Sequence, residues 1–367
     1  MKQLDLRSAL LRETTRYPAG FALPDLPRDE KGDFDRKKAR NILLSEEYGV
    51  VADEGITHTV SMGKTKENCV AGKCARYCRW TFTFSKNGDA AGFPVDLYLP
   101  AVPLAGRPLV VALDFSADPT RNYFPMEEVL ARGVALARVQ YDLVTSDDGD
   151  FTNGLARLLV PDCSDPQAAG KLAVWAWAAA AVARELVGQG IAQSDTLWIS
   201  GHSRLGKTAL LAAALDPVFA GVHSNNSGCS GMAISREKTG ETVAKITRTF
   251  PYWFAPRYAF YADREREMPF DQHFLAALVA PRRLSVSAAE QDTWADTEAQ
   301  FLCAEAASVA WREQGAVGLD PACGLPRVGE RSLNGRLAFQ TRPGTHYFSL
   351  DDWRFLLDFI DLSCKNA

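Results

Sequence analysis

The segment from Gly201 to Thr208 is where residue types and spacing point most directly to chemistry. It follows a short apolar stretch and precedes an Ala/Leu-rich one, which predicts a strand, a tight turn and a helix. On such a turn Ser203 would present its hydroxyl above a sheet as a nucleophile. The same residues also match the phosphate-binding pattern G-x-x-x-x-G-K-[ST]. The two interpretations predict different reactions.

The sequence after Thr208 disfavours phosphate binding. A nucleotide-binding loop of this kind needs a later apolar strand that ends in an aspartate and holds Mg²⁺. The apolar stretches at residues 219–223 and 284–288 are not followed directly by such an aspartate. We therefore favour nucleophilic catalysis.

Nucleophilic catalysis by Ser203 needs an acid and a histidine base later in the chain. Of the five histidines, only His223, His273 and His346 follow the serine. His346 comes between the last predicted strand and the last predicted helix, where folds of this type place their base. Taken singly, Ser203 and His346 could also be a strand-end serine and a helix-capping histidine. Their joint occurrence at the expected positions favours a catalytic pair.

The elements that must hold these residues are visible as hydrophobic patterns. Residues 79–84 and 95–99 alternate with period two around Asn87-Gly88-Asp89, which predicts an antiparallel hairpin. Short apolar stretches then alternate with helical ones, the longest at residues 171–187. This order predicts an α/β sandwich of three layers, with a mainly parallel central sheet and antiparallel N-terminal strands.

Composition excludes several classes of protein. The chain has 367 residues, with 41 Lys+Arg against 45 Asp+Glu and a formal net charge of −4. It has no basic excess for nucleic acid and no run near the roughly 18–20 apolar residues of a membrane helix. We therefore expect the protein to bind neither nucleic acid nor a membrane. We also expect it to be a monomer. The first residues lack the apolar segment of a signal peptide, which predicts a cytoplasmic protein if Met1 is the natural start.

Cys69, Cys74 and Cys78 lie close together in the sequence, and His58 precedes them. A zinc site can be imagined from these four residues, but their spacings match no common Cys-x-x-Cys pair. A disulfide or buried thiols fit better. We predict no metal and no other cofactor. We expect residues 1–75 to form an N-terminal extension packed on a catalytic domain of residues 76–367.

A series of short motifs in order over roughly residues 95 to 362 shares its pattern with one enzyme family. They are Gly201-His202-Ser203-Arg204-Leu205-Gly206-Lys207, Asn225-Asn226-Ser227-Gly228-Cys229-Ser230-Gly231, Gly240-Glu241-Thr242, Phe250-Pro251-Tyr252-Trp253-Phe254, Pro269-Phe270-Asp271-Gln272-His273, Ala280-Pro281-Arg282, Asp292-Thr293-Trp294-Ala295-Asp296 and Gly344-Thr345-His346. The set resembles the glucuronoyl esterase family of α/β-hydrolases. The family's Ser-Arg-x-Gly-Lys turn accounts for Leu205 where other hydrolases have glycine.

The resemblance implies hydrolysis of esters between (methyl)glucuronic acid groups of xylan and alcohols of lignin, through an acyl-enzyme. It implies that Ser203 is the nucleophile and His346 the general base. Arg204 would hold the oxyanion through its backbone N–H and its guanidinium, a preorganised charge of the kind that stabilises such intermediates. Relatives of this kind are usually secreted or periplasmic.

Three further residues match family positions that contact the uronate: Lys207, Glu241 and Trp294. Each also has a plain structural interpretation, as a helix-start lysine, a surface glutamate and a core tryptophan. His273 resembles a family motif near the site, although we expect it to be structural.

The acid departs from the family pattern. Many relatives have Glu where this sequence has Asn226, and an amide cannot offset the charge of the imidazolium. The loop after the strand predicted at residues 284–287 is the standard acid position and contains Glu290, Asp292 and Asp296. We predict Asp292 as the acid, with Asp296 second, although Asp292 could also be a turn residue.

Two other functions stay open at this point. The protein could remove acetyl or feruloyl groups from a polysaccharide. It could also be a non-catalytic carbohydrate-binding relative that lost its triad together with the Glu at position 226.

Overall fold

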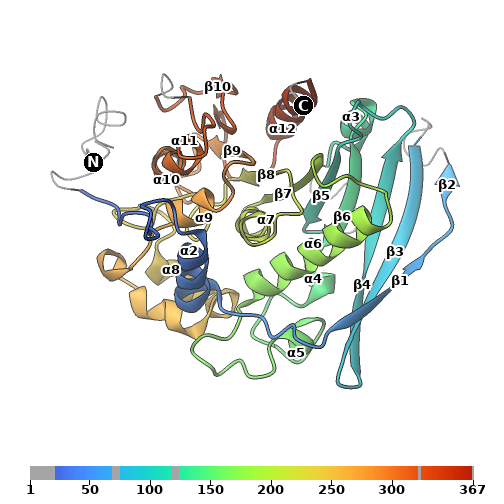
Figure 1. Ribbon diagram of the computed structural model, residues 1–367, viewed down its shortest axis with the longest axis horizontal. Helices are drawn as coiled ribbons and strands as arrows, with labels where there is room; N and C mark the ends of the chain where they lie inside the picture. Colours follow the sequence, from blue (N-terminus) through green and yellow to red (C-terminus); the bar gives the residue numbers. More distant parts are fainter. Residues whose placement is uncertain (1–20, 68–74, 117–123, 321–323, 366–367) are drawn as a thin grey trace.

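Helices cover both faces of one 11-stranded sheet in the computed structural model, which describes residues 21–67, 75–116, 124–320 and 324–365 (Figure 1). Along the sheet the strand order is β1-β3-β4-β6-β5-β7-β8-β9-β11-β10, and β2 pairs with β3. The strands are β1 (Thr57–Met62), β2 (Lys66–Glu67), β3 (Ala75–Lys86), β4 (Asp89–Pro100), β5 (Leu109–Asp114), β6 (Ala135–Gln140), β7 (Leu197–His202), β8 (Gly221–Asn225), β9 (Arg283–Ala289), β10 (Arg331–Ser332) and β11 (Leu337–Arg342).

Helices separate the central strands along the chain, and the longest of those described matches the stretch predicted at residues 171–187. The helices are α2 (Arg36–Leu43), α3 (Met126–Ala131), α4 (Tyr141–Val144), α5 (Ala156–Leu159), α6 (Lys171–Gly188), α7 (Arg204–Leu215), α8 (Val243–Thr249), α9 (His273–Ala277), α10 (Thr297–Ala307), α11 (Val309–Arg312) and α12 (Leu350–Lys365). A π-helix, η1 (Leu44–Tyr48), and three 3-10 helices complete the set: η2 (Pro251–Trp253), η3 (Pro256–Tyr261) and η4 (Glu265–Glu267). Within the described ranges, no helix combines the length and apolarity that a bilayer crossing needs.

The strands are antiparallel towards both ends of the sheet and parallel in its centre. β3 and β4 form the predicted hairpin, with Asn87 at φ 52° and Gly88 at φ 89° in its two-residue turn, the conformation that matches strand twist. β4 then pairs antiparallel with β6, whereas β6, β5, β7, β8, β9 and β11 are parallel neighbours. The predicted mainly parallel sheet with antiparallel N-terminal strands is confirmed.

Alternate residues of the central strand β5 face different helix layers. Val110 and Ala112 pack in a cluster with residues of α3 and α12, whereas Leu109 and Val111 pack in the cluster that contains α6 and α7. Figure 1 shows α12 and α3 on one side of the sheet and α6 and α7 on the other. Such a strand, buried on both faces, is apolar throughout, which is why the sequence reveals it.

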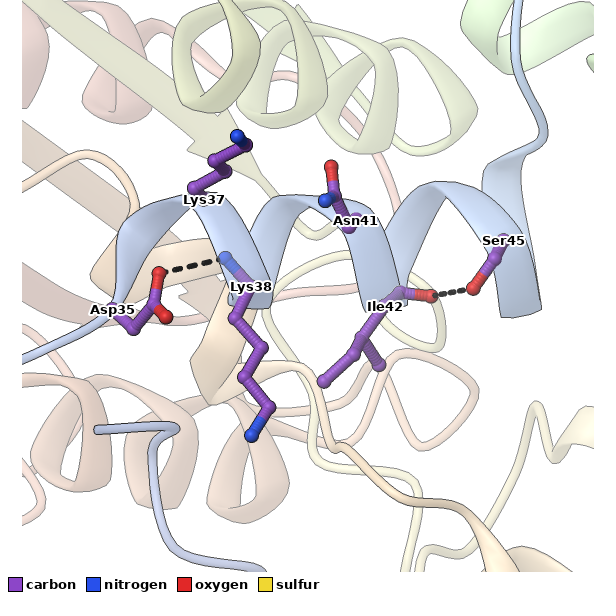
Figure 2. A pocket seen from close by; sticks show the side chains of 6 residues that line it. All are labelled: Asp35, Lys37, Lys38, Asn41, Ile42 and Ser45. Carbon is purple, nitrogen blue, oxygen red and sulfur yellow. Dashed lines mark hydrogen bonds between the residues drawn. The ribbon is translucent and has the colours of Figure 1, made fainter. Parts of the chain in front are cut away.

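The described part of the N-terminal extension contributes strands to the same sheet and a helix beside it. β1 pairs antiparallel with β3 along its whole length. α2 begins at the N-cap Asp35, whose Oδ1 accepts from Lys38 N at 2.9 Å (Figure 2), and Arg36 donates to the carbonyl of Ala280 at 2.7 Å. The boundary expected at residue 75 stays a prediction, and two strands on its N-terminal side lie in the sheet.

Cys69 and Cys74 lie outside the described residues, so their pairing is untested. Cys78 is a free thiol that donates to the carbonyl of Gly63 at 2.9 Å. His58 is paired in register with Phe84, six residues along β3 from Cys78 and therefore about 20 Å away. His58 and Cys78 do not share a metal site, and the described residues contain no group of three or more ligands placed to hold one.

Candidate active site

Ser203 occupies the tight turn between β7 and α7. Its φ of 57° and ψ of −126° are strained for a residue with a side chain. Two glycines permit the turn: a Cβ would lie 2.1 Å from the carbonyl oxygen of Leu205 if added to Gly201, and 2.9 Å from that of Asn225 if added to Gly206. The turn therefore presents Ser203 at the carboxyl edge of the sheet.

Ser203, His346 and Asp292 form one hydrogen-bonded series. The Ser203 hydroxyl donates to His346 Nε2 at 2.8 Å, and His346 Nδ1 donates to Asp292 Oδ2 at 2.6 Å. The three residues follow β7, β11 and β9, parallel strands whose carboxyl ends meet at one edge of the sheet. A hydroxyl, an imidazole and a carboxylate in this order can carry out nucleophilic acyl transfer.

Asp292 is suited to face a histidine that becomes charged. Burial would raise the pKa of its carboxyl, but the hydrogen bond and charge of His346 and the N–H of Ala295 outweigh burial. The pKa of Asp292 therefore lies below its ordinary value, and its side chain is 1% exposed. The carboxyl is ionised where it contacts the imidazole.

The other two acid positions weighed from the sequence have different contacts. Asp296 caps α10, with Oδ1 accepting from Ala299 N at 3.1 Å and Oδ2 from Thr239 N at 3.0 Å. Asn226 joins two strands, because its Oδ1 accepts from Ala289 N at 2.8 Å. Both side chains thus support the framework around the triad.

Arg204 begins α7, directly after the nucleophile. Backbone N–H groups at a helix start have no partner within the helix and attract negative charge. The guanidinium pairs with Asp147 and lies 4.7 Å from the ring centre of Trp253, 5.2 Å from that of Phe250 and 5.8 Å from that of Phe115. Its Nε is buried and has no hydrogen-bond partner in the part of the chain that the structure describes. The side chain is 25% exposed, and its accessible N–H groups can donate to a developing oxyanion.

His202 lies beside the base. Its Nδ1 donates to Asn225 Oδ1 at 2.6 Å, and its ring centre is 4.6 Å from that of His346. Burial, followed by the nearby His346, lowers the pKa of His202 to about 3. A neutral ring at this place adds no charge next to the catalytic imidazole.

A cleft of about 510 Å³ opens in front of Ser203 and His346. Its walls are largely aromatic, as expected for a site that takes an organic ligand. The lining residues are Leu113, Asp114, Phe115, Phe124, His202, Ser203, Arg204, His346, Tyr347 and Phe348.

Lys207 and Glu241 form a buried ion pair. Lys207 Nζ donates to Glu241 Oε2 at 2.7 Å and to the carbonyls of Ser227 and Cys229 at 2.6 and 2.7 Å. The two residues are 2% and 4% exposed. All three N–H groups of the ammonium are therefore used, and Glu241 is not the surface glutamate that the sequence left open.

Trp294 stands next to this pair at the surface. Its carbonyl accepts from the backbone N–H of Glu241 at 3.0 Å, and the residue is 43% exposed. Lys245 Nζ lies 5.6 Å from its ring centre. The exposed ring excludes the core interpretation and leaves an aromatic face open to solvent.

His273 lies away from the triad in its contacts. Its Nε2 is 3.0 Å from the carbonyl oxygen of Pro24, and burial lowers the pKa of the ring to about 4. These contacts fit the structural role expected from the sequence.

A second hollow, of about 400 Å³, lies against α2 (Figure 2). Lys37 and Lys38 extend from the helix in different directions there, so its polar groups do not converge on one point. The arrangement able to do chemistry is the one at Ser203.

Three features of the site were not predicted from the sequence: the Asp147 partner of Arg204, the aromatic groups around its guanidinium, and the neutral His202. The motif at residues 250–254 was noticed, but no spacing rule connects it with Arg204. Asp147 comes from a loop 57 residues earlier in the chain, and nothing local marks it.

Comparisons with known proteins agree with this geometry. A family model described as "Glucuronyl esterase, fungi" matches residues 82–315. "Carbohydrate esterase MZ0003" from an unknown prokaryotic organism is 31% identical, over 89% of this chain and 83% of that protein. A 4-O-methyl-glucuronoyl methylesterase from Podospora anserina is 30% identical over 50% of this chain, which spans 40% of the fungal protein.

Solved structures are similar over nearly the whole length. A glucuronoyl esterase from Solibacter usitatus superposes with a TM-score of 0.85 at 29% identity, covering 95% of this chain and 98% of that one. A promiscuous CE15 esterase from a marine bacterial metagenome gives a TM-score of 0.84 at 27% identity, covering 94% and 97%. The α/β-hydrolase fold expected from the sequence is confirmed. This chain belongs to the glucuronyl esterase family.

Proposed function

We propose that this protein is a serine carboxyl-ester hydrolase that cleaves esters of glucuronic or 4-O-methylglucuronic acid, such as those linking xylan to lignin. The observation that carries the proposal is the hydrogen-bonded series from Ser203 through His346 to Asp292 at the mouth of the cleft. The names of relatives that act on 4-O-methyl-glucuronoyl esters support the substrate class.

In the first half-reaction Ser203 Oγ attacks the ester carbonyl carbon while His346 Nε2 takes the hydroxyl proton. The imidazolium that forms is stabilised by the ionised Asp292, which accepts from Nδ1. Arg204 donates to the carbonyl oxygen as it becomes negative, through its backbone N–H and its guanidinium. His346 then gives its proton to the departing alcohol oxygen, and the acyl-enzyme remains.

In the second half-reaction a water molecule attacks the acyl-enzyme. His346 takes a proton from this water, and the ester bond to Ser203 Oγ breaks as Oγ regains a proton. The products are the free uronic acid and the regenerated serine. Each proton transfer to or from Ser203 uses the hydrogen bond that it already makes with His346.

The acyl side of the substrate would lie near Trp294 and Glu241. The exposed indole ring offers a flat face for the sugar ring, and Glu241 can accept from a sugar hydroxyl. Lys207 fixes the Glu241 carboxylate, since its Nζ is bonded to Oε2 and to two carbonyls. We therefore assign Lys207 to holding Glu241 in place rather than to a first contact with the sugar.

The test compares benzyl glucuronate with 4-nitrophenyl acetate as substrates. Ser203→Ala is expected to abolish turnover of both, whereas Glu241→Gln should reduce turnover of the glucuronate at least about 10-fold and leave the acetate within about 2-fold. Equal losses on the two esters in Glu241→Gln would favour a different polysaccharide esterase. Absence of turnover by the wild type would leave a carbohydrate-binding protein.

A further inference from the structure

Asp147 is the centre of a set of hydrogen bonds beneath Arg204. Its Oδ2 pairs with Arg204 Nη1 and accepts from the Tyr141 hydroxyl at 2.8 Å. Its Oδ1 accepts from Trp253 Nε1 at 2.7 Å, and its carbonyl accepts from the Tyr252 hydroxyl at 2.9 Å. The carboxylate is therefore bound on both oxygens and cannot rotate freely.

The loop that carries Asp147 is itself tied to α6. Lys171 Nζ donates to Thr145 Oγ1 at 2.8 Å, and Trp175 Nε1 donates to the Thr145 carbonyl at 3.2 Å. Asn153 Oδ1 accepts from the N–H of Ser146 at 2.9 Å. Because Lys171 and Trp175 are among the fully buried side chains, the residues before Asp147 have a fixed position.

We propose that Asp147 is a positioning residue that holds the Arg204 guanidinium by one end, so that the accessible part of the guanidinium stays directed to the oxyanion formed at Ser203. This inference rests on the proposed ester hydrolysis. It goes beyond the family resemblance, which assigns Arg204 but gives no residue that holds it.

The geometry explains why an anchor is needed. The aromatic rings of Trp253, Phe250 and Phe115 attract a cation, but such contacts are not directional enough to fix a rotamer. An Arg–carboxylate hydrogen bond is directional and stronger. With Nη1 bonded to Asp147 and Nε buried, the accessible quarter of the Arg204 side chain at the cleft is the part that can reach an oxyanion. A donor fixed before the reaction needs no reorganisation as charge develops.

A kinetic cycle of Asp147→Asn, Arg204→Met and the double variant tests the proposal. Asp147→Asn keeps the shape of the side chain but replaces one acceptor by a donor facing Arg204. We expect kcat to fall about 10- to 100-fold with KM within about 3-fold, less than the roughly 100- to 1000-fold cost of deleting an oxyanion donor. In the Arg204→Met background, Asp147→Asn should lower kcat by less than about 2-fold, because the group it holds is absent.

Asp148→Asn is the matched control. It removes the same charge from the next residue of the same loop, and its carboxylate contacts Ser146 Oγ at 2.6 Å and Asp150 N at 2.9 Å. Its kcat should stay within about 2-fold of the wild type. If Asp147→Asn does not fold, Tyr141→Phe is the second probe, because it removes one donor to Asp147 without changing charge. Tyr141→Phe should lower kcat by less than Asp147→Asn does, and this loss should also vanish in the Arg204→Met background.

Two results would overturn the inference. One is a kcat for Asp147→Asn at or above the wild-type value. The other is a fold-loss of kcat from Asp147→Asn that is the same in the wild type and in the Arg204→Met variant. Both substrates are measured, since oxyanion stabilisation serves any ester. If the wild type hydrolyses 4-nitrophenyl acetate but not benzyl glucuronate, the uronate proposal fails while the Asp147 cycle can still be read on the acetate.

Discussion

Asp292 Oδ2 accepts the hydrogen bond of His346 Nδ1 at 2.6 Å, and the two residues follow neighbouring parallel strands, β9 and β11. The acid and the base of the site therefore come from one pair of adjacent strand ends. Asn226, which follows the next strand, β8, accepts from the backbone N–H of Ala289 instead. This relationship predicts how the two aspartates of the loop differ.

Asp292→Asn should lower kcat by roughly 1000-fold or more, because the amide cannot stabilise the imidazolium and favours the wrong tautomer of His346. Steady-state kinetics on benzyl glucuronate measure this loss. Asp296→Asn is the comparison from the same loop. It should retain most of kcat, and its loss should be in stability, about 1 kcal/mol, because the amide places a donor where Asp296 Oδ2 accepts from Thr239 N. A large loss of kcat in Asp296→Asn with Asp292→Asn active would reverse the assignment.

Lys207→Met should destabilise the fold, because it leaves Glu241 buried without its cation. Breaking a buried pair costs about 3–5 kcal/mol, whereas removing both charges costs much less. Urea unfolding of Lys207→Met and of the double variant Lys207→Met/Glu241→Gln measures the difference. Equal stability of the two variants would show that the pair is not coupled.

Ser203→Gly should raise the free energy of unfolding by about 1 kcal/mol while abolishing hydrolysis, since glycine tolerates φ 57° and ψ −126° without strain. Ser203→Ala is the control, because it removes the same hydroxyl and keeps the Cβ. Thermal unfolding of the two variants side by side measures the strain. If Ser203→Gly is no more stable to heat than Ser203→Ala, the backbone at the turn is not strained.

Glu47 predicts a pH dependence of stability. Burial raises the pKa of this carboxyl to about 7, and Gln272 Nε2 donates to its two oxygens at 3.0 and 2.9 Å. In the unfolded chain the group titrates near pH 4.3, so between about pH 4.3 and 7 the folded state binds more protons and stability falls as pH rises.

Glu47→Gln removes this titration. Relative to the wild type, the variant should gain on the order of 2–3 kcal/mol of unfolding free energy between pH 4.5 and pH 8. Urea unfolding at both pH values measures the change, and the exposed Glu290→Gln variant serves as the control. A difference between Glu47→Gln and wild type that is independent of pH would contradict the assignment.

The sequence was sufficient for the parts of the site that depend on local pattern. Ser203 is recognisable because strand, glycine spacing and helix all lie within one segment, and His346 because few histidines follow it. Asp292 and Asp296 lie on one loop, and their separation depends on the backbone at Asp296, whose φ of 63° turns its side chain onto α10. No composition rule encodes that torsion.

Other parts depend on contacts between distant segments. Asp147 meets Arg204 only because the loop after α4 crosses the start of α7. β1 went unpredicted because most of its residues are exposed at the sheet edge, so its burial pattern is weak. Edge strands and long-range polar contacts have this in common: they are determined by the residues that they pack against, so their own residues carry little of the pattern that would predict them.

The order of the strands also has a consequence for folding. The serine and the base are 143 residues apart, and the base follows β11, which joins the sheet beside β9 near the end of the chain. Contacts of such large sequence separation form late, because a long loop must close first. Recovery of esterase activity during refolding should therefore lag behind the recovery of helical signal, and it reports the docking of the last central strand.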